Sequence, residues 1–313
     1  MNPLHLPTEL PLARYRLTFL ITHPLQLPPY AASTLRGVFG HTLLATACTC
    51  SHKTSPHHAG CPYAQIFEPA PNPNLPSSIR NNPPPPYLIE TPLVAATHYP
   101  VGSEYHFHLV LMGQARHWLP LLTAVFDQAF THGLGTGNRG KGKLIRVEVQ
   151  QPNHDYHLIS QNNSPISIHM NNIVLPENYS THPLIQLFTP LRIQQKGKII
   201  PAHELTQALF LRQLLRRYLT LAQLHWSDAH SSTPAELSEQ ISEQHTSPTL
   251  TWHEQRRYSN RQGQTTPLSG IIGTWQLTNL SPAFAQMLYI GQWLHLGKET
   301  VFGNGQYQIL QAG

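Results

Sequence analysis

Apolar residues alternate with polar ones in some stretches of the first half of the chain, and in others they recur every three to four positions. Alternation predicts a strand, and the longer spacing predicts a helix. The predicted elements are strand 15–22, helix 31–46 with Ser33 or Thr34 as cap, strands 87–94 and 105–112, helix 118–130 and strand 144–149. This order is one βαββαβ unit.

The second half repeats that order after an Asn-, His- and Pro-rich stretch. The predicted elements are strand 184–193, helix 204–226, paired strands 249–258 and 271–277, helix 282–293 and strand 306–310. The polar segment 230–247, between helix 204–226 and strand 249–258, need not be ordered. We therefore predict an α+β fold of two tandem ferredoxin-like (RRM-like) domains with antiparallel sheets, at 1–150 and 183–313, joined by 151–182. Such a sheet is a common platform for single-stranded RNA.

Composition narrows the choice of partner. Only 11% of the 313 residues are charged, yet Lys and Arg outnumber Asp and Glu by 20 to 15, and the pI is about 9.2. A sparse positive excess favours a polyanion without naming nucleic acid. Three cysteines, an odd number, argue against a disulfide framework and fit a reducing compartment. With no long apolar run and no signal-like N-terminus, we expect no membrane association and a cytoplasmic protein.

Four segments carry a resemblance to a known family. They are PPYAASTLRGVFGH at 28–41, CPYAQIF at 61–67, RYSNRQ at 257–262 and HLGKETVFGNGQY at 295–307. In this order they resemble the CRISPR repeat-processing endoribonucleases of the RAMP superfamily, over nearly the whole chain. The resemblance implies tandem ferredoxin-like domains that bind CRISPR repeat RNA.

The resemblance also implies a chemistry. The RNA's own 2′-hydroxyl would attack the phosphate without a metal or other cofactor, leaving a 2′,3′-cyclic phosphate and a 5′-hydroxyl. The product would be guide RNA (crRNA) for other subunits of an interference complex. In that family a His in or near the first helix usually catalyses the reaction. The sequence shows no clustered carboxylates of the kind that a two-metal nuclease needs.

His41 is the candidate for that role. It lies off the apolar stripe of helix 31–46, beside Gly37 and Gly40, which each cost about 1 kcal/mol relative to Ala in a helix. That cost indicates a close approach, either of an RNA backbone or of a neighbouring element. Imidazoles titrate near neutral pH, so one here could move the proton of a 2′-hydroxyl or of the leaving 5′-oxygen. The alternative is a surface or inter-domain His that bonds a carbonyl.

Three residues near this helix could assist. Tyr30 could hold a phosphate oxygen or orient the ribose, and Lys53 could neutralise the developing charge. Arg36, on another flank of the helix, could bind the RNA phosphate as well. Each has an ordinary alternative: a packing Tyr, a solvated Lys, and an Arg paired with Glu68 or Glu90.

Two glycine-rich loops and one basic hairpin are the candidate RNA-binding segments. The glycines would let backbone amides approach phosphates, with the cations alongside. The alternative is flexible surface turns. The candidate residues are Arg139, Lys141 and Lys143 in or after the first loop, His295 and Lys298 in the second, and Arg256, Arg257 and Arg261 in the hairpin.

The cysteines offer a metal site as an alternative. Cys48, Cys50 and Cys61 with His57 could form a three-Cys, one-His zinc site. The Cys-x-Cys gap is tighter than the usual spacing, so the sequence favours three reduced cysteines without a metal.

Two other functions stay open at this stage. One is a non-catalytic RAMP subunit that binds guide RNA in an interference complex. The other is a ferredoxin-like protein that binds a small anion through its glycine-rich loops. Replacing His41 separates the first from a nuclease, and RNA affinity separates the second.

Overall fold

The computed structural model describes residues 6–51, 57–58, 60–93, 96–134, 139–162, 164–226, 238–241, 249–259 and 264–310. The chain divides into two compact units. The N-terminal unit is Pro11–Ile173, and the C-terminal unit combines Met1–Leu10 with Val174–Gly313.

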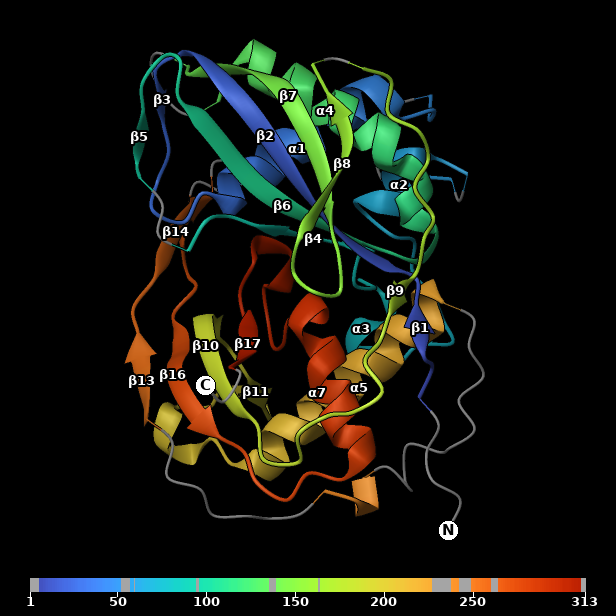
Figure 1. Cartoon of the computed structure of the whole chain (residues 1–313), viewed down its shortest axis with the longest axis vertical. Coiled ribbons are helices and arrows are strands. Elements are labelled where there is room, and N and C mark those ends of the chain that lie inside the picture. Colours follow the sequence, from blue (N-terminus) through green and yellow to red (C-terminus); the bar gives the residue numbers. More distant parts are fainter. Residues whose placement is uncertain are drawn as a thin grey trace. The chain divides into compact units, whose positions relative to one another are not determined.

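The N-terminal unit is built on a five-stranded antiparallel sheet (Figure 1). Its strands are β2 (Leu12–His23), β4 (Tyr87–Glu90), β6 (Glu104–Met112), β7 (Lys141–Gln150) and β8 (Tyr156–Gln161). Their order across the sheet is β4-β6-β2-β7-β8. Without β8, the first and third strands of the βαββαβ unit lie in the centre, which is the ferredoxin-like order.

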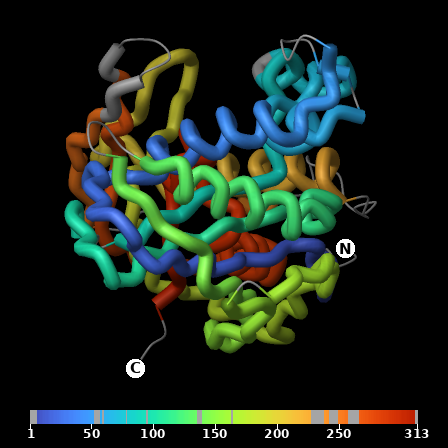
Figure 2. The backbone as a smooth tube through the Cα atoms, turned by 90° about the horizontal axis from the view of Figure 1, so that it is seen from above, coloured from blue at the N-terminus to red at the C-terminus, as the bar shows by residue number. Residues whose placement is uncertain are grey.

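Two helices cover this sheet because one face of β2 is apolar. Helices α1 (Ala32–Ala47) and α4 (Leu119–His132) run side by side (Figure 2). Phe19 of β2 stacks on Phe130 of α4, with the ring centroids 3.8 Å apart. Phe39 of α1 stacks on Phe126 of α4 at 4.8 Å. This aromatic core holds α1 to the sheet, and with it the predicted catalytic helix.

Three local features of this unit differ from the sequence prediction. Helix α1 is preceded by Ala31 without a side-chain cap, so neither Ser33 nor Thr34 caps it. A 3-10 helix, η1 (Gly113–Trp118), leads into α4. The predicted connector supplies β8 to the sheet, because Arg146 to Gln150 of β7 pair with it.

Short elements complete the N-terminal unit. They are β3 (Leu25–Gln26) paired with β5 (His98–Tyr99), and helices α2 (Pro62–Ile66) and α3 (Ser77–Arg80). Strand β1 (Glu9–Leu10), which belongs to the C-terminal unit, pairs with β9 (Ile173–Val174), where the chain passes from one unit to the other. Arg116 of η1 holds the segment that follows β8, donating to the carbonyls of Met170 and Asn171.

The C-terminal unit has a four-stranded antiparallel sheet in the order β13-β16-β10-β17, which is again ferredoxin-like. Its strands are β10 (Leu184–Leu191), β13 (Thr249–His253), β16 (Gly270–Gln276) and β17 (Tyr307–Leu310). Helices α5 (Gln207–His225) and α7 (Pro282–Leu294) begin at side-chain caps, Thr206 and Ser281. The predicted fold class is confirmed in both units.

The predicted strand 249–258 is two strands in the structure. Residues after β13 turn away and form β14 (Arg256–Ser259), which pairs with β15 (Gln264–Pro267) in a hairpin. The remaining elements are β11 (Gln194–Gln195), β12 (Lys198–Ile199), η2 (Ala202–Glu204) and η3 (Thr300–Phe302). Among the described residues, no helix combines the length and apolar character needed to cross a membrane.

Candidate active site and RNA-binding residues

His41 lies on the exposed side of α1. The buried positions of the helix are Ala32, Leu35, Phe39, Gly40, Thr42 and Leu43. These positions pack toward the aromatic core, and the turn between Phe39 and Leu43 places the His41 ring in solvent. An exposed imidazole on a helix that is fixed by its opposite face can meet a substrate without rearrangement of the core.

The two glycines of α1 have different surroundings. A Cβ atom at Gly40 would lie 2.6 Å from Cε2 of Phe67, so this glycine admits the ring that follows α2. The same atom at Gly37 would meet nothing within 4 Å. Of the two predicted explanations, the neighbouring element therefore accounts for Gly40. Gly37 leaves a bare strip of helix surface one turn before His41.

The three predicted assisting residues have different surroundings. Tyr30 is exposed just before α1, and partial burial raises the pKa of its hydroxyl. The guanidinium of Arg36 lies over the Phe67 ring, 4.3 Å from the centroid, and its positive charge opposes the burial that raises the pKa of the Tyr87 hydroxyl to about 12. These contacts give Arg36 a packing role, and its RNA contact stays a prediction. Lys53 lies outside the described residues.

The first glycine-rich loop is closed by its own backbone. Leu134 and Gly140 exchange N–H···O bonds of 2.8 and 3.1 Å at the base of the loop. A Cβ atom at Gly140 would lie 2.7 Å from the Pro24 carbonyl oxygen, so close backbone packing explains this glycine. Of the predicted cations, Arg139 and Lys143 are exposed and Lys141 is half-buried. Residues 135–138 lie outside the described part of the chain.

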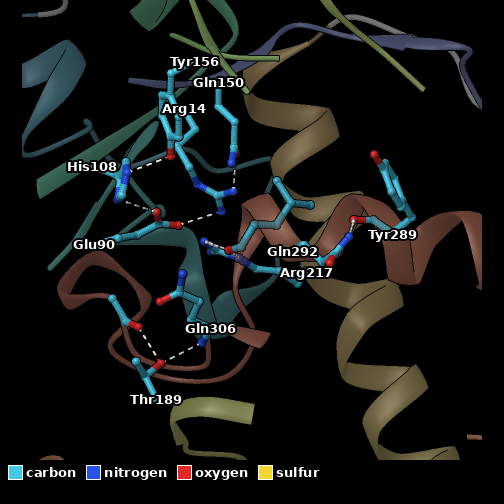
Figure 3. A network of polar contacts seen from close by, with 12 residues as sticks. Arg14, Glu90, His108, Gln150, Tyr156, Thr189, Arg217, Tyr289, Gln292 and Gln306 are labelled. Carbon is cyan, nitrogen blue, oxygen red and sulfur yellow. Dashed lines mark hydrogen bonds and ion pairs between the residues drawn. The ribbon is translucent and has the colours of Figure 1, made fainter. Parts of the chain in front are cut away.

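The second glycine-rich loop uses its glycines for packing as well. Gly297 and Gly305 have positive φ angles of 90° and 71°, and Cβ atoms there would collide with the backbones of Arg192 and Leu296. Several amides already donate within the protein: those of Leu296, Lys298, Phe302, Gly303, Gly305 and Gln306. The Gln306 amide donates to the Thr189 hydroxyl, and this hydroxyl itself donates to the Gly303 carbonyl (Figure 3). The expected phosphate cradle is not found at these amides.

The two predicted RNA-binding residues of this loop, His295 and Lys298, differ in solvent exposure. Lys298 is exposed. His295 is buried and has a positive φ of 53°. Just before it, Arg217 of α5 donates two hydrogen bonds to the Leu294 carbonyl at the end of α7. The RNA contact of His295 stays a prediction, and it would require a buried ring to be uncovered.

The basic hairpin is the β14–β15 pair. Arg256 is exposed at its base. Arg257 belongs to β14, opposite Thr266, but its side chain is not described. Arg261 lies outside the described residues. The hairpin is confirmed as an element, and its contact with RNA stays a prediction.

A row of charged residues that was not predicted from the sequence crosses the sheet of the N-terminal unit. Glu90, His108, Arg16 and Glu148 are in register on β4, β6, β2 and β7. Arg16 makes a bidentate ion pair with Glu148, with both N···O distances 2.7 Å, and lies over the Tyr156 ring. Arg14 and Arg16 at spacing two within β2 were the available signal, since alternate residues share a face.

Buried charges beside this row satisfy one another (Figure 3). Arg14 donates to Glu90 over 2.8 Å and to Gln150 over 2.8 Å. His108 hydrogen-bonds the Tyr156 hydroxyl at 2.8 Å. Burial lowers the pKa of His108 to about 4, although Glu90 opposes the shift. His108 is therefore neutral at physiological pH, and the ion pairs fix this face of the sheet.

The three cysteines and His57 come together after α1. Their sulfur and ring-nitrogen atoms all lie within 4.8 Å of one another. Nδ1 of His57 is 3.5 Å from Sγ of Cys48 and 3.3 Å from Sγ of Cys50. Burial raises the pKa of the Cys61 thiol, but nearby backbone N–H groups lower it to about 6. The predicted set of four is thus assembled, and it is the sole group of three or more His, Cys, Asp or Glu side chains with metal-binding geometry within the described residues.

Two family models match the chain in adjacent ranges. The N-terminal domain AF_1859_N matches residues 10–172, and the CRISPR-associated endoribonuclease Cas6 matches residues 185–307. The boundary between the two matches falls near the boundary between the two units. No curated protein sequence matches the chain.

Solved structures share the fold over nearly the full chain. The Thermus thermophilus Cas6 (TTHB231) product complex has a TM-score of 0.57 at 16% identity, covering 97% of this chain and 100% of that one. The Cas6 (TTHA0078) product complex has a TM-score of 0.50 at 13% identity, with coverages of 96% and 99%.

A third similar structure is a much longer protein. The partial Cas6-RT-Cas1–Cas2 complex has a TM-score of 0.60 at 14% identity and covers 98% of this chain. The match takes in 47% of that protein, so the present chain spans about half of its length. At these identities the likeness establishes a common fold.

Proposed function

Because the chain belongs to the Cas6 family of CRISPR-associated proteins, as its four sequence motifs indicated, we propose that it is an endoribonuclease that cuts CRISPR repeat RNA. The observation that carries this proposal is the exposed His41 on a helix that the aromatic core holds to the sheet. The product is guide RNA, and the partners are the repeat RNA and the interference subunits that take up the guide.

In the proposed mechanism the RNA supplies its own nucleophile. The 2′-hydroxyl attacks the adjacent phosphorus, the P–O5′ bond breaks, and a 2′,3′-cyclic phosphate and a 5′-hydroxyl result. His41 takes the 2′-hydroxyl proton or protonates the leaving 5′-oxygen, which contributes about 10²–10⁴-fold in rate. Tyr30 orients the ribose or a phosphate oxygen, and Lys53 neutralises charge on the phosphate.

The absence of a metal from this mechanism is part of the proposal. A two-metal nuclease holds its ions with several carboxylates. Within the described residues, the sole metal-binding geometry comes from Cys and His side chains. Soft thiolates select zinc rather than magnesium, so this cluster would not supply the ions of a two-metal nuclease.

The test uses labelled repeat RNA, with and without a 2′-deoxy substitution at the cut nucleotide. We expect the wild type to cut the all-RNA substrate in EDTA, leaving a cyclic phosphate, and to leave the deoxy substrate intact. His41→Ala should bind the RNA with unchanged affinity and lose cleavage by about 10²-fold or more. Cleavage of the deoxy substrate would refute the 2′-hydroxyl mechanism.

A second variant separates catalysis from damage to the helix. His132→Ala removes an exposed histidine from α4 in the same unit, and it should cut like the wild type. If neither the wild type nor His41→Ala cuts while both bind, the chain is a non-catalytic guide-binding subunit. Equal cutting by the two would make His41 a bystander.

A further inference from the structure

We propose that Cys48, Cys50, His57 and Cys61 bind one structural zinc ion that joins the end of α1 to the start of α2. The four ligand atoms already lie within 4.8 Å of one another. A tetrahedral zinc site, with Zn–S near 2.3 Å and Zn–N near 2.0 Å, separates its ligand atoms by about 3.5–3.8 Å. Small rotations of the side chains would therefore close the cluster on one ion.

Hydrogen bonding alone accounts poorly for this cluster. One ring nitrogen, Nδ1 of His57, faces two sulfur atoms, those of Cys48 and Cys50, at 3.5 and 3.3 Å. A ring nitrogen can make one good hydrogen bond, either as donor or as acceptor. The sulfur atoms of Cys48, Cys50 and Cys61 also lie within 4.8 Å of one another. Four ligand atoms within 4.8 Å of one another, with a single ring nitrogen between two sulfur atoms, fit a shared cation better than a set of hydrogen bonds.

The choice of zinc follows from the ligands. Three thiolates and one imidazole are the donors that zinc prefers in closed structural sites, and hard cations such as magnesium prefer oxygen. Every protein ligand position is filled, so no open position is left for a reacting water. The site is therefore structural, and it plays no part in the proposed cleavage chemistry.

The ligands sit at the junctions of the two helices. Cys48 is the C-cap residue that directly follows α1, and Cys61 is the N-cap residue that directly precedes α2. The ring of Tyr63 in α2 lies beside the His57 ring, with centroids 4.9 Å apart, and thus fixes the imidazole from outside the cluster. A zinc ion would close the loop between the helices and hold α2 against α1.

His58 provides a matched control. It neighbours His57 in sequence, but its Nε2 atom hydrogen-bonds the Thr49 hydroxyl at 2.9 Å, outside the four ligands. Replacing His58 therefore changes the same loop and the same residue type without removing a ligand.

The first experiment measures metal in the full chain, purified without chelator and without a metal-affinity tag. We expect an equimolar amount of zinc in the wild type and in His58→Gln, and almost none in Cys50→Ser or His57→Ala. A wild type that carries no zinc and takes up none after reduction would overturn the proposal. Loss of zinc in His58→Gln but not in His57→Ala would show that His58, and not His57, is the imidazole ligand, and this would contradict the proposed ligand set.

A second measurement does not depend on the folding of variants. Modification of the wild-type thiols by a mercurial reagent should release zinc in step with the loss of three thiols. Cobalt added to the metal-free chain should show the visible absorption bands of a tetrahedral thiolate site. Cobalt spectra typical of octahedral oxygen ligands would refute the assignment. Neither measurement uses RNA, so failure here leaves the proposed nuclease activity untouched.

Discussion

At the scale of single residues, Gly37 offers the sharpest test of where the RNA lies. Nothing would contact a Cβ atom there, so packing does not explain this glycine. Alanine should raise helix stability by about 1 kcal/mol, and the midpoint of thermal unfolding should rise by about 2–4 °C. If RNA passes over this strip, the added methyl group should slow single-turnover cleavage by about tenfold or more, because small displacements at a reacting site are costly.

A matched control keeps this Gly37→Ala prediction informative. Thr46 is exposed in the last turn of α1, and its hydroxyl bonds the Thr42 carbonyl within the helix. Thr46→Ala should change helix stability without changing cleavage. A Gly37→Ala enzyme that cuts as fast as Thr46→Ala would show that RNA does not approach α1 at Gly37.

His108 makes the stability of the chain depend on pH. Its pKa in the folded chain is about 4, lowered by burial, against about 6.5 when exposed. Between these values the unfolded chain binds a proton that the folded chain does not. The free energy of unfolding should therefore fall as pH falls from 6.5 to 4, by at most about 1.4 kcal/mol per pH unit.

His108→Gln tests this dependence. Glutamine can still hydrogen-bond the Tyr156 hydroxyl but cannot titrate, so the decline between pH 6.5 and 4 should become shallower in denaturant unfolding. Burial also lowers the pKa of His106 and of His169, so part of the decline should remain. His117→Gln, at an exposed position, is the control. An unchanged slope in His108→Gln would contradict the assignment.

At the scale of elements, α1 and α2 pack closely where Gly40 of α1 faces the ring of Phe67, the residue that follows α2. Gly40→Ala pushes a methyl group against Phe67, and we expect a loss of about 1–3 kcal/mol in the free energy of unfolding. Phe67→Leu alone should destabilise the chain by leaving a cavity. The double variant should lose less free energy of unfolding than the two single variants lose together, because the smaller leucine side chain at position 67 makes room for the methyl group at position 40. Strict additivity in this double-mutant cycle would mean that the two residues do not meet.

The helices and strands were largely predictable from the sequence, whereas the packing contacts that require glycine within them were not. The periodicity of Tyr15, Leu17 and Phe19 is local, so the strand could be found from sequence alone. The contact between Gly40 and Phe67 depends on α2 folding back on α1, which no local pattern reveals. Strand β8 was missed for a similar reason: its place at a sheet edge is decided by pairing with β7. Likewise, the exposure of His41 was readable from the helical wheel, whereas the burial of His295 required the fold.

At the scale of the whole molecule, the charge is sparse and partly neutralised within the chain. The formal net charge is +5, with 11% of residues charged. On the N-terminal sheet, Arg146 pairs with both Glu104 and Glu148, so it contributes little to attracting a polyanion. The predicted RNA-binding cations that the structure leaves exposed are Arg139, Lys143, Arg256 and Lys298. Among the described residues, these four cations form a small set of candidate phosphate contacts.

A small set of contacts has a measurable consequence for salt dependence. Each phosphate contact to single-stranded RNA adds about 0.7 to the slope of log K against log salt concentration. Arg256→Ala should therefore weaken repeat binding and flatten that slope by about 0.7 in a salt titration. Lys196→Ala, which removes an exposed cation from the turn between β11 and β12, should leave the slope unchanged. If both variants shift binding equally without changing the slope, the net charge attracts the RNA and the basic hairpin does not touch it.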